Sequence, residues 1–140
     1  AGRAVYDALV APRERVTDFR TFVTGLDARY LRKARDFFAV QQEVASLIRG
    51  RVLVGHALHN DLQALLLQHP KHLVRDTAQY VPLRSKPRVE GGRGRPRALR
   101  HLAKEVLGLE IQGGSHDPAE DARTALLLYQ RHQARWEAAL

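Results

Sequence analysis

A strand pattern, a polar motif and a helical pattern follow one another directly in the middle of the chain. The strand pattern is the β-branched run at Val52–Val54, and the motif is Gly55-His-Ala-Leu-His-Asn-Asp61. The apolar stretch Leu62–Leu67 follows, so Asp61 is expected at the junction of a strand and a helix. Strands that alternate with helices predict an α/β domain.

A second polar motif, His116-Asp-Pro-Ala-Glu-Asp121, has the composition of a helix start. Asp117 is the expected N-cap, Pro118 suits the first helical position, and Glu120 has the spacing of a capping box. We expect this last helix to run from about Pro118 towards Trp136. Its apolar side is expected to contain Ala122, Ala125, Leu126 and Tyr129.

The two motifs each place a carboxylate near the start of a helix. Asp121 shares a helical face with Ala125 and Leu128, at spacings of four and seven residues, and is expected to point into the protein. A buried carboxylate needs a partner, which is either an arginine or a metal ion. Asp61 has a simpler interpretation, in which Asn60 and Asp61 cap the following helix.

The two carboxylates suggest metal-assisted chemistry. Two divalent ions about 3.5–4 Å apart can orient an attacking water and stabilise the leaving oxygen of a phosphodiester, and they need several converging carboxylates. Asp61 and Asp121 would supply two of these. A histidine can accept the proton of the water, and His116 is the candidate base. His56 and His59, taken alone, fit better as hydrogen-bonded loop histidines.

The charge balance favours a polyanionic partner, and nucleic acid is the commonest one for a basic domain. The chain has 23 Lys and Arg against 15 Asp and Glu, which gives a net charge of +8. The stretch from Pro82 to Pro96 is rich in glycine and predicts a flexible loop rather than a packed element. This loop either attracts phosphate or is an ordinary solvated surface. Its basic residues, with the next arginine, are Arg84, Lys86, Arg88, Arg93, Arg95 and Arg97.

The absence of cysteine limits the metal chemistry. With 0 Cys, disulfides and thiolate metal sites are excluded, and carboxylate and imidazole remain as ligands. Oxygen ligands favour magnesium or manganese. No run approaches the ~20 apolar residues of a membrane span, and the first residues lack the apolar core of a signal peptide. We therefore expect a soluble, intracellular protein without a membrane partner.

The pattern predicts further elements along the chain. Asp27 is expected to cap a short helix through Lys33, and Asp36 a longer one that ends at Gly50. The other expected elements are a strand at Val5–Val10, a loop at Val16–Gly25, a strand near Val74–Thr77, and a helix at Ala98–Leu107 that is closed by Gly108. The inward face of this last helix is expected to carry Leu99, Leu102, Ala103, Val106 and Leu107.

Four segments have a familiar order: Val16–Thr21 with Thr24-Gly-Leu26, Arg51–Asp61, Arg75-Asp-Thr77, and His116–Asp121 followed by Leu128-Tyr129. In this order they resemble the DEDDh exonucleases of the ribonuclease H-like superfamily. The likeness is closest to eukaryotic RNA exonuclease 4 and its interferon-stimulated and apoptosis-enhancing relatives, and it covers nearly the whole chain.

The resemblance implies a ribonuclease H-like three-layer α/β fold with a mixed sheet, and a metal-dependent 3′-to-5′ exonuclease. In such an enzyme Asp61 and Asp121 would bind two Mg²⁺ or Mn²⁺ ions, and His116 would act as general base. Arg20, His59 and Asn60 would contact the nucleotide. The expected substrates are 3′ ends of RNA or single-stranded DNA. The RNA exonuclease 4 branch further implies ribosomal RNA processing in the nucleus, at the nucleolus.

The chain departs from the family pattern in one respect. That pattern begins with an Asp-x-Glu strand and a second strand, whereas the match here starts at Val5–Val10, the third. Asp7 and Glu14 have a different context and spacing. We therefore expect residues 1–140 to form one exonuclease domain that lacks the first strands. Two alternatives stay open: a catalytically inactive nucleic-acid-binding module, and a fragment that dimerises through an uncovered sheet edge.

Overall fold

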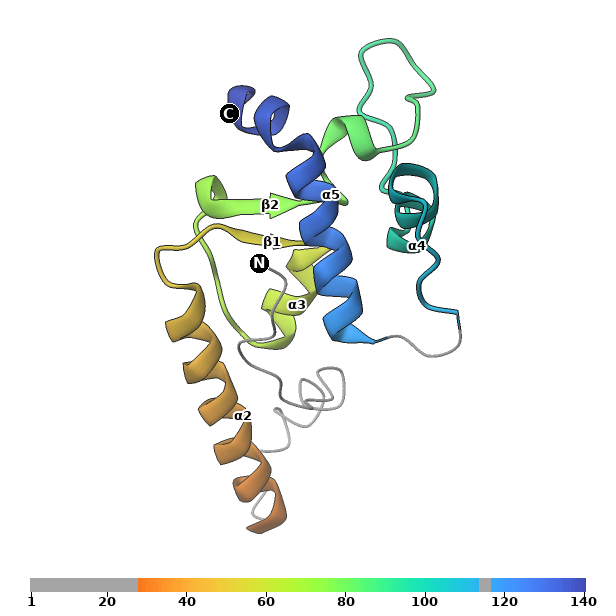
Figure 1. The fold of residues 1–140 in the computed structure, drawn as a ribbon. Helices are drawn as coiled ribbons and strands as arrows, with labels where there is room; N and C mark the ends of the chain where they lie inside the picture. The colour runs from red at the N-terminus through yellow and green to blue at the C-terminus, as the bar shows by residue number, and fades with distance from the viewer. Residues whose placement is uncertain (1–27, 114–116) are drawn as a thin grey trace. The chain divides into compact units, whose positions relative to one another are not determined.

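The computed structural model describes residues 28–113 and 117–140. The expected strand at Val5–Val10 and the expected loop at Val16–Gly25 lie outside these residues, as do Arg20 and His116. The described elements, in chain order (Figure 1), are α2 (Ala28–Ile48), β1 (Leu53–Gly55), α3 (Leu58–Ala64), the 3-10 helix η1 (Lys71–Leu73), β2 (Val74–Asp76), the 3-10 helix η2 (Val81–Leu83), α4 (Leu99–Leu102), the π-helical turn η3 (Ala103–Leu107) and α5 (Pro118–Ala138).

The described residues divide into two compact units, and each is considered by itself. The sheet unit contains residues 53–58 and 74–140, without the gap at 114–116. The helical unit contains residues 28–52 and 59–73. None of the described helices is both long and apolar enough to cross a membrane.

The sheet unit is built on two parallel strands. Leu53 of β1 pairs with Val74 of β2, and Gly55 pairs with Asp76. Helix α5 packs against β1 and against the α4–η3 segment, and Figure 1 shows it running past the ends of both strands. Both strands lie within a residue or two of their predicted positions. Helix α3 comes between β1 and β2 in the chain, and the two strands pair in parallel. This order agrees with the predicted α/β class.

The core of the sheet unit lies between α4, η3 and α5. Leu102 and Leu128 are fully buried in it, and the Tyr80 ring stacks on Trp136 with centroids 4.0 Å apart. Burial of each such leucine contributes about 1.5–3 kcal/mol. The predicted inward face of the helix after Ala98 is confirmed. The buried core residues are Leu83, Leu99, Leu102, Ala103, Ile111, Leu128, Tyr129 and Trp136.

Helix α5 starts as the sequence predicted but buries a slightly different face. The Asp117 side chain accepts a hydrogen bond from the Ala119 N–H, and Pro118 occupies the first turn. Ala122 was expected inside and is exposed, and this prediction was wrong. Tyr129, seven residues later and about 20° away round the helix, is buried, so this side of α5 is covered further along the helix but not at Ala122. Thr124 is buried instead, with its hydroxyl donating to the Glu120 carbonyl at 2.8 Å.

In the helical unit, α2 is one continuous helix where two were expected. Asp36 lies in its interior and is exposed, so it caps nothing. The residues around Asp36 include no glycine or proline, so no local signal interrupts the helical hydrogen bonds. The predicted end is confirmed, because Gly50 has φ +68° and Arg51 N–H donates to the Ile48 carbonyl.

From Arg84 to Pro96 the basic stretch forms a loop without helix or strand, as expected, but hydrogen bonds within it were not expected. The Arg84 guanidinium turns back into the loop and donates to the carbonyls of Arg93 and Gly94, at 3.0 and 2.8 Å. Ser85 N–H donates to the Arg95 carbonyl at 2.9 Å. These hydrogen bonds join the two ends of the stretch, so it forms an ordered loop on the sheet unit.

Candidate active site

Asp121 lies in the first turn of α5, where its own N–H donates to the Asp117 carbonyl at 2.9 Å. One carboxylate oxygen accepts a hydrogen bond of 2.8 Å from Nε2 of Gln112. Gln112 has a φ of +60°, and its backbone N–H lies 3.4 Å from a carboxylate oxygen of Glu120. The segment before α5 therefore orients the Asp121 side chain. Asp121 is half-buried, next to the buried Ala125 and Leu128, as predicted.

His56 follows β1 directly and belongs to the same unit as Asp121. Its Nδ1 lies 2.8 Å from the hydroxyl of Thr77. Burial lowers the pKa of His56 below its usual 6.5, although the charges of Asp76 and Asp121 act in the opposite direction. The imidazole is therefore neutral at pH 7, close to the two carboxylates.

Asp76 organises the turn that leads from β1 into α3. One carboxylate oxygen accepts from the N–H groups of Ala57 and Ala78, at 2.8 and 2.9 Å. The other accepts from Leu58 N–H at 2.9 Å. Ala57 has a φ of +58°, a conformation that costs a residue with a Cβ about 1–2 kcal/mol. Asp76, which belongs to β2, thus accepts the hydrogen bonds that an N-cap residue of α3 would otherwise accept.

Gly55 allows the same turn to be tight. A Cβ at this position would lie 2.3 Å from Cδ2 of Leu58, and Leu58 is buried. A side chain at residue 55 would therefore push Leu58 out of place and shift the start of α3. The glycine of the first motif is explained by this contact.

The remaining predicted residues of the first motif lie on α3, in the helical unit. Helix α3 begins at Leu58, so Asp61 lies within its first turn. The alternative in which Asn60 and Asp61 cap this helix is excluded, because the turn held by Asp76 starts the helix three residues before Asp61. His59, Asn60 and Asp61 are all exposed. At the other end of α3, Gln41 of α2 donates from Nε2 to the Leu65 carbonyl at 2.8 Å.

The donor groups suit a hard divalent ion. Asp61 and Asp121 offer carboxylate oxygens, the ligand type that Mg²⁺ and Mn²⁺ prefer. Within residues 28–113 and 117–140, no group of three histidine or acidic side chains has the spacing of a metal site. His116 and Arg20, predicted as base and nucleotide ligand, lie outside the described residues.

Sequence reasoning did not single out three of these residues for the roles that the structure shows. His56 is a hydrogen-bonded loop histidine, as expected, but its nearness to the charges of Asp76 and Asp121 was not foreseen. Asp76 and Gln112 were assigned no role. Asp76 was visible only as part of Arg75-Asp-Thr77, a segment of the family pattern. Its function depends on residues 18 and 19 positions away, which no local pattern encodes.

Comparison with known proteins finds relatives among RNA exonucleases. RNA exonuclease 4 of Debaryomyces hansenii is 43% identical over 139 residues, which cover 99% of this chain and 49% of that protein. RNA exonuclease 4 of Aspergillus fumigatus is 48% identical over 136 residues, covering 97% and 42%. The chain thus spans about half the length, or less, of these curated relatives.

A solved structure is also similar. The Saccharomyces cerevisiae Pan2 pseudoubiquitin hydrolase–RNA exonuclease module, in complex with AAUUAA RNA, matches with a TM-score of 0.57 and 39% identity. The match covers 70% of this chain and 15% of that one. The model of the exonuclease family RNase T matches residues 2–129, which include both sequence motifs. The chain therefore belongs to this exonuclease family, whose domain is ribonuclease H-like.

Proposed function

We propose that this protein is a 3′-to-5′ exonuclease that acts on RNA. The observation that carries the proposal is the match of residues 2–129 to the exonuclease family, because these residues include Asp61, Asp121 and His116. The similarity to RNA exonuclease 4 proteins and to an RNA-bound Pan2 module supports RNA as the substrate class. By the same similarity we propose ribosomal RNA processing as its role and the nucleolus as its location.

The exonuclease family generally uses divalent metal ions, and we propose Mg²⁺ or Mn²⁺ for this protein, held by Asp61 and Asp121. When bound, such ions activate a water and stabilise the leaving oxygen of a phosphodiester. Gln112 holds one oxygen of Asp121 and so fixes the direction of the carboxylate. His116 is the proposed base for the water. Arg20, His59 and Asn60 are the proposed contacts to the terminal nucleotide.

The test is the degradation of a 5′-labelled single-stranded RNA by the chain in the presence of Mn²⁺. We expect a ladder of products that shorten from the 3′ end. Asp121→Asn keeps the shape of the side chain but removes its charge, and is expected to lower the rate by about 10²-fold or more, since even a partner of a metal ligand is worth 10–100-fold. The same oligonucleotide as DNA measures the preference for RNA.

Two results would count against the proposal. Equal ladders with the wild-type chain and Asp121→Asn would show that the nuclease is a contaminant or that Asp121 is not a ligand. RNA that is bound in a salt-dependent way but never shortened would favour the second candidate, a nucleic-acid-binding module without catalysis. The basic stretch from Pro82 to Pro96, on the sheet unit, is the feature that supports this second candidate.

A further inference from the structure

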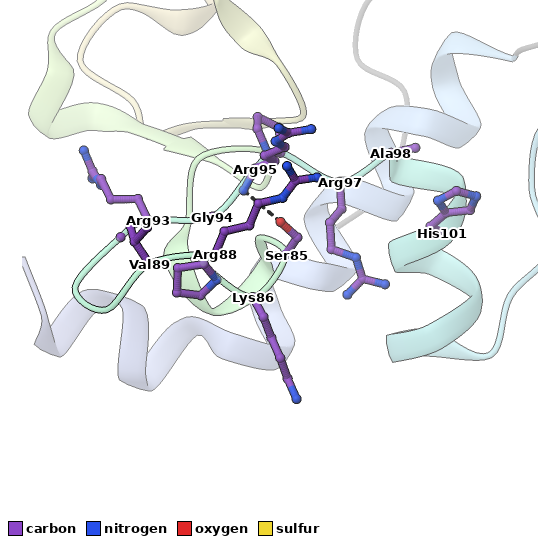
Figure 2. A pocket seen from close by; sticks show the side chains of 13 residues that line it. Ser85, Lys86, Arg88, Val89, Arg93, Gly94, Arg95, Arg97, Ala98 and His101 are labelled. Carbon is purple, nitrogen blue, oxygen red and sulfur yellow. Dashed lines mark hydrogen bonds between the residues drawn. The ribbon is translucent and has the colours of Figure 1, made fainter.

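A hollow of about 730 Å³ lies on the loop between η2 and α4. Residues 85–89 and 92–98 line it, together with His101 of α4. We call this segment, residues 84–98, the basic loop. Figure 2 shows the side chains of Arg88 and Arg95 extending towards the same side of the loop, with Lys86 and Arg93 pointing elsewhere.

The guanidinium of Arg84 points into the basic loop and hydrogen-bonds the backbone that forms the wall of the hollow. Arg84 donates to the carbonyls of Ala78, Arg93 and Gly94, at 3.2, 3.0 and 2.8 Å. It also donates to Oε1 of Gln79 at 2.9 Å. An arginine with several donors in a fixed plane can tie together carbonyls from two sides of a loop. The cation of Arg84 is therefore used for structure and is not presented to a ligand.

The two ends of the basic loop also approach each other closely. Ser85 and Arg95 exchange two hydrogen bonds of 2.9 Å, one from each backbone N–H. Gly94 has a φ of +73°, and a Cβ at this position would lie 1.9 Å from the Ser85 carbonyl oxygen. Only glycine fits there. The loop is thus held in one shape before any ligand arrives, which lowers the entropy cost of binding.

The side chains around the hollow carry positive charge that described residues do not neutralise. Lys86, Arg88, Arg93 and Arg95 are exposed, and none makes an ion pair with any residue that the structure describes. Arg97 differs, since it pairs with Glu105. None of the described residues lining the hollow is acidic. Such a surface attracts a polyanion.

The lining also indicates which part of a nucleic acid would bind. It contains no Phe, Tyr or Trp among the described residues, and its only aromatic ring is that of His101. Binding through bases would require stacking surfaces, whereas guanidinium groups pair with phosphate oxygens through two parallel hydrogen bonds. The hollow therefore suits a phosphodiester backbone and not a base.

The basic loop lies in the same unit as Asp121 and His56. The backbone of Arg97, at the end of the loop, and the charge of Asp121 both act to raise the pKa of His56. A strand with its 3′ end at Asp121 would thus have the basic loop within the same unit.

We infer that the basic loop binds phosphates of the RNA strand whose 3′ end is hydrolysed, through Arg88 and Arg95 in particular. The inference rests on the proposed function for the identity of the ligand. Phosphate contacts of this kind hold a strand without reading its sequence. The loop would therefore increase affinity for RNA of any sequence and would not select a terminal nucleotide.

The experiment measures binding of a fluorescent single-stranded RNA to the 140-residue chain by anisotropy, in EDTA and over a range of KCl concentrations. The test variant is Arg88→Gln/Arg95→Gln. The matched control is Arg131→Gln/Arg135→Gln, which removes the same charge from exposed positions of α5. We expect the test variant alone to lower the slope of log K against log salt by about 1.4, since each single-strand phosphate contact contributes about 0.7.

Equal weakening by the test and control pairs would overturn the inference, because it would show that net charge alone binds RNA. Arg88→Lys/Arg95→Lys keeps the charge and provides a second check: it should retain the slope, with weaker binding. The assay involves no hydrolysis. A chain that binds RNA through Arg88 and Arg95 but never shortens it would contradict the proposed function and leave the inference standing. If the wild-type chain shortens RNA and the test variant binds RNA as tightly as the wild type, the proposed function stands and the inference is contradicted.

Discussion

Asp76 satisfies three backbone N–H groups with one carboxylate, and two of them belong to the turn that starts α3. The carboxylate comes from β2, so the geometry of the first motif depends on the pairing of β1 with β2. Without this acceptor, the left-handed conformation of Ala57 would lose the contacts that offset its strain. At the scale of single residues, Asp76 is a positioning residue for the helix that carries Asp61.

We predict that Asp76→Asn lowers the free energy of unfolding by about 1–2 kcal/mol, the usual cost of losing a helix cap. The amide can still accept on one side, but its NH₂ group would then face the N–H of Leu58. Urea unfolding followed by fluorescence of the single tryptophan, Trp136, measures this loss. Asp36→Asn, at an exposed position inside α2, is the control and should unfold like the wild type. An unchanged midpoint for Asp76→Asn would contradict the capping role.

At the scale of elements, the basic loop shows how a glycine-rich segment can be ordered. Gly91 and Gly94 both have positive φ values, of +78° and +73°. Their surroundings differ, because a Cβ at Gly91 would meet nothing within 4 Å, whereas one at Gly94 would collide with the backbone of Ser85. Gly91 is therefore needed only for the conformation of the turn, whereas Gly94 also allows the two ends of the loop to approach each other.

This difference predicts a matched pair of variants. Gly91→Ala and Gly94→Ala each place a Cβ in the left-handed region, at a cost of about 1–2 kcal/mol. Only Gly94→Ala should also separate Arg95 from Ser85 and open the loop. Limited trypsin digestion measures how far the loop opens, because the loop contains several arginines at which trypsin can cleave. We expect cleavage within residues 84–97 to be several-fold faster in Gly94→Ala than in Gly91→Ala. Similar rates in the two variants would show that the Ser85 contact does not hold the loop.

At the scale of the whole molecule, one ion pair ties the end of the chain to the sheet. Arg75 of β2 is 5% exposed and binds Glu137 of α5 through two hydrogen bonds, of 2.7 and 3.1 Å. The hydroxyl of Tyr129 donates to the same carboxylate at 2.5 Å. The hydrogen bonds from Arg75 and then Tyr129 lower the pKa of Glu137 from 4.5 to about 2. The end of α5 is thereby attached to β2, 62 residues earlier in the chain.

The lowered pKa makes stability depend on pH in a definite direction. Because Glu137 binds its proton more weakly in the folded chain, its contribution is fully present above pH 4.5 and is lost as the pH falls towards 2. Glu137→Gln should therefore lower the melting temperature at pH 7, and its difference from the wild type should shrink between pH 4.5 and 2. Glu43→Gln, on an exposed position of α2, is the control. A difference that stays constant with pH would exclude this carboxylate as the titrating group.

The sequence by itself determined the features that depend on neighbouring residues. Asp117 and Pro118 start α5 as expected, and Gly50 and Gly108 end their helices in the left-handed conformation. The two strands and the inward face after Ala98 also followed from local periodicity. These predictions succeeded because caps, turns and amphipathic faces are short-range effects, decided within about one helical turn.

Only the tertiary structure decided which residue performs a structural task at a distance. The sequence offered Asn60 and Asp61 as one possible cap of α3, but Asp76 of β2 accepts the hydrogen bonds of the N–H groups at its start. It predicted a flexible basic loop, but Arg84 ties that loop to itself across 9 and 10 residues. The physical reason is the same in both cases. A carboxylate or guanidinium bonds whichever backbone groups the fold brings within about 3 Å, and the local sequence around it does not specify these partners.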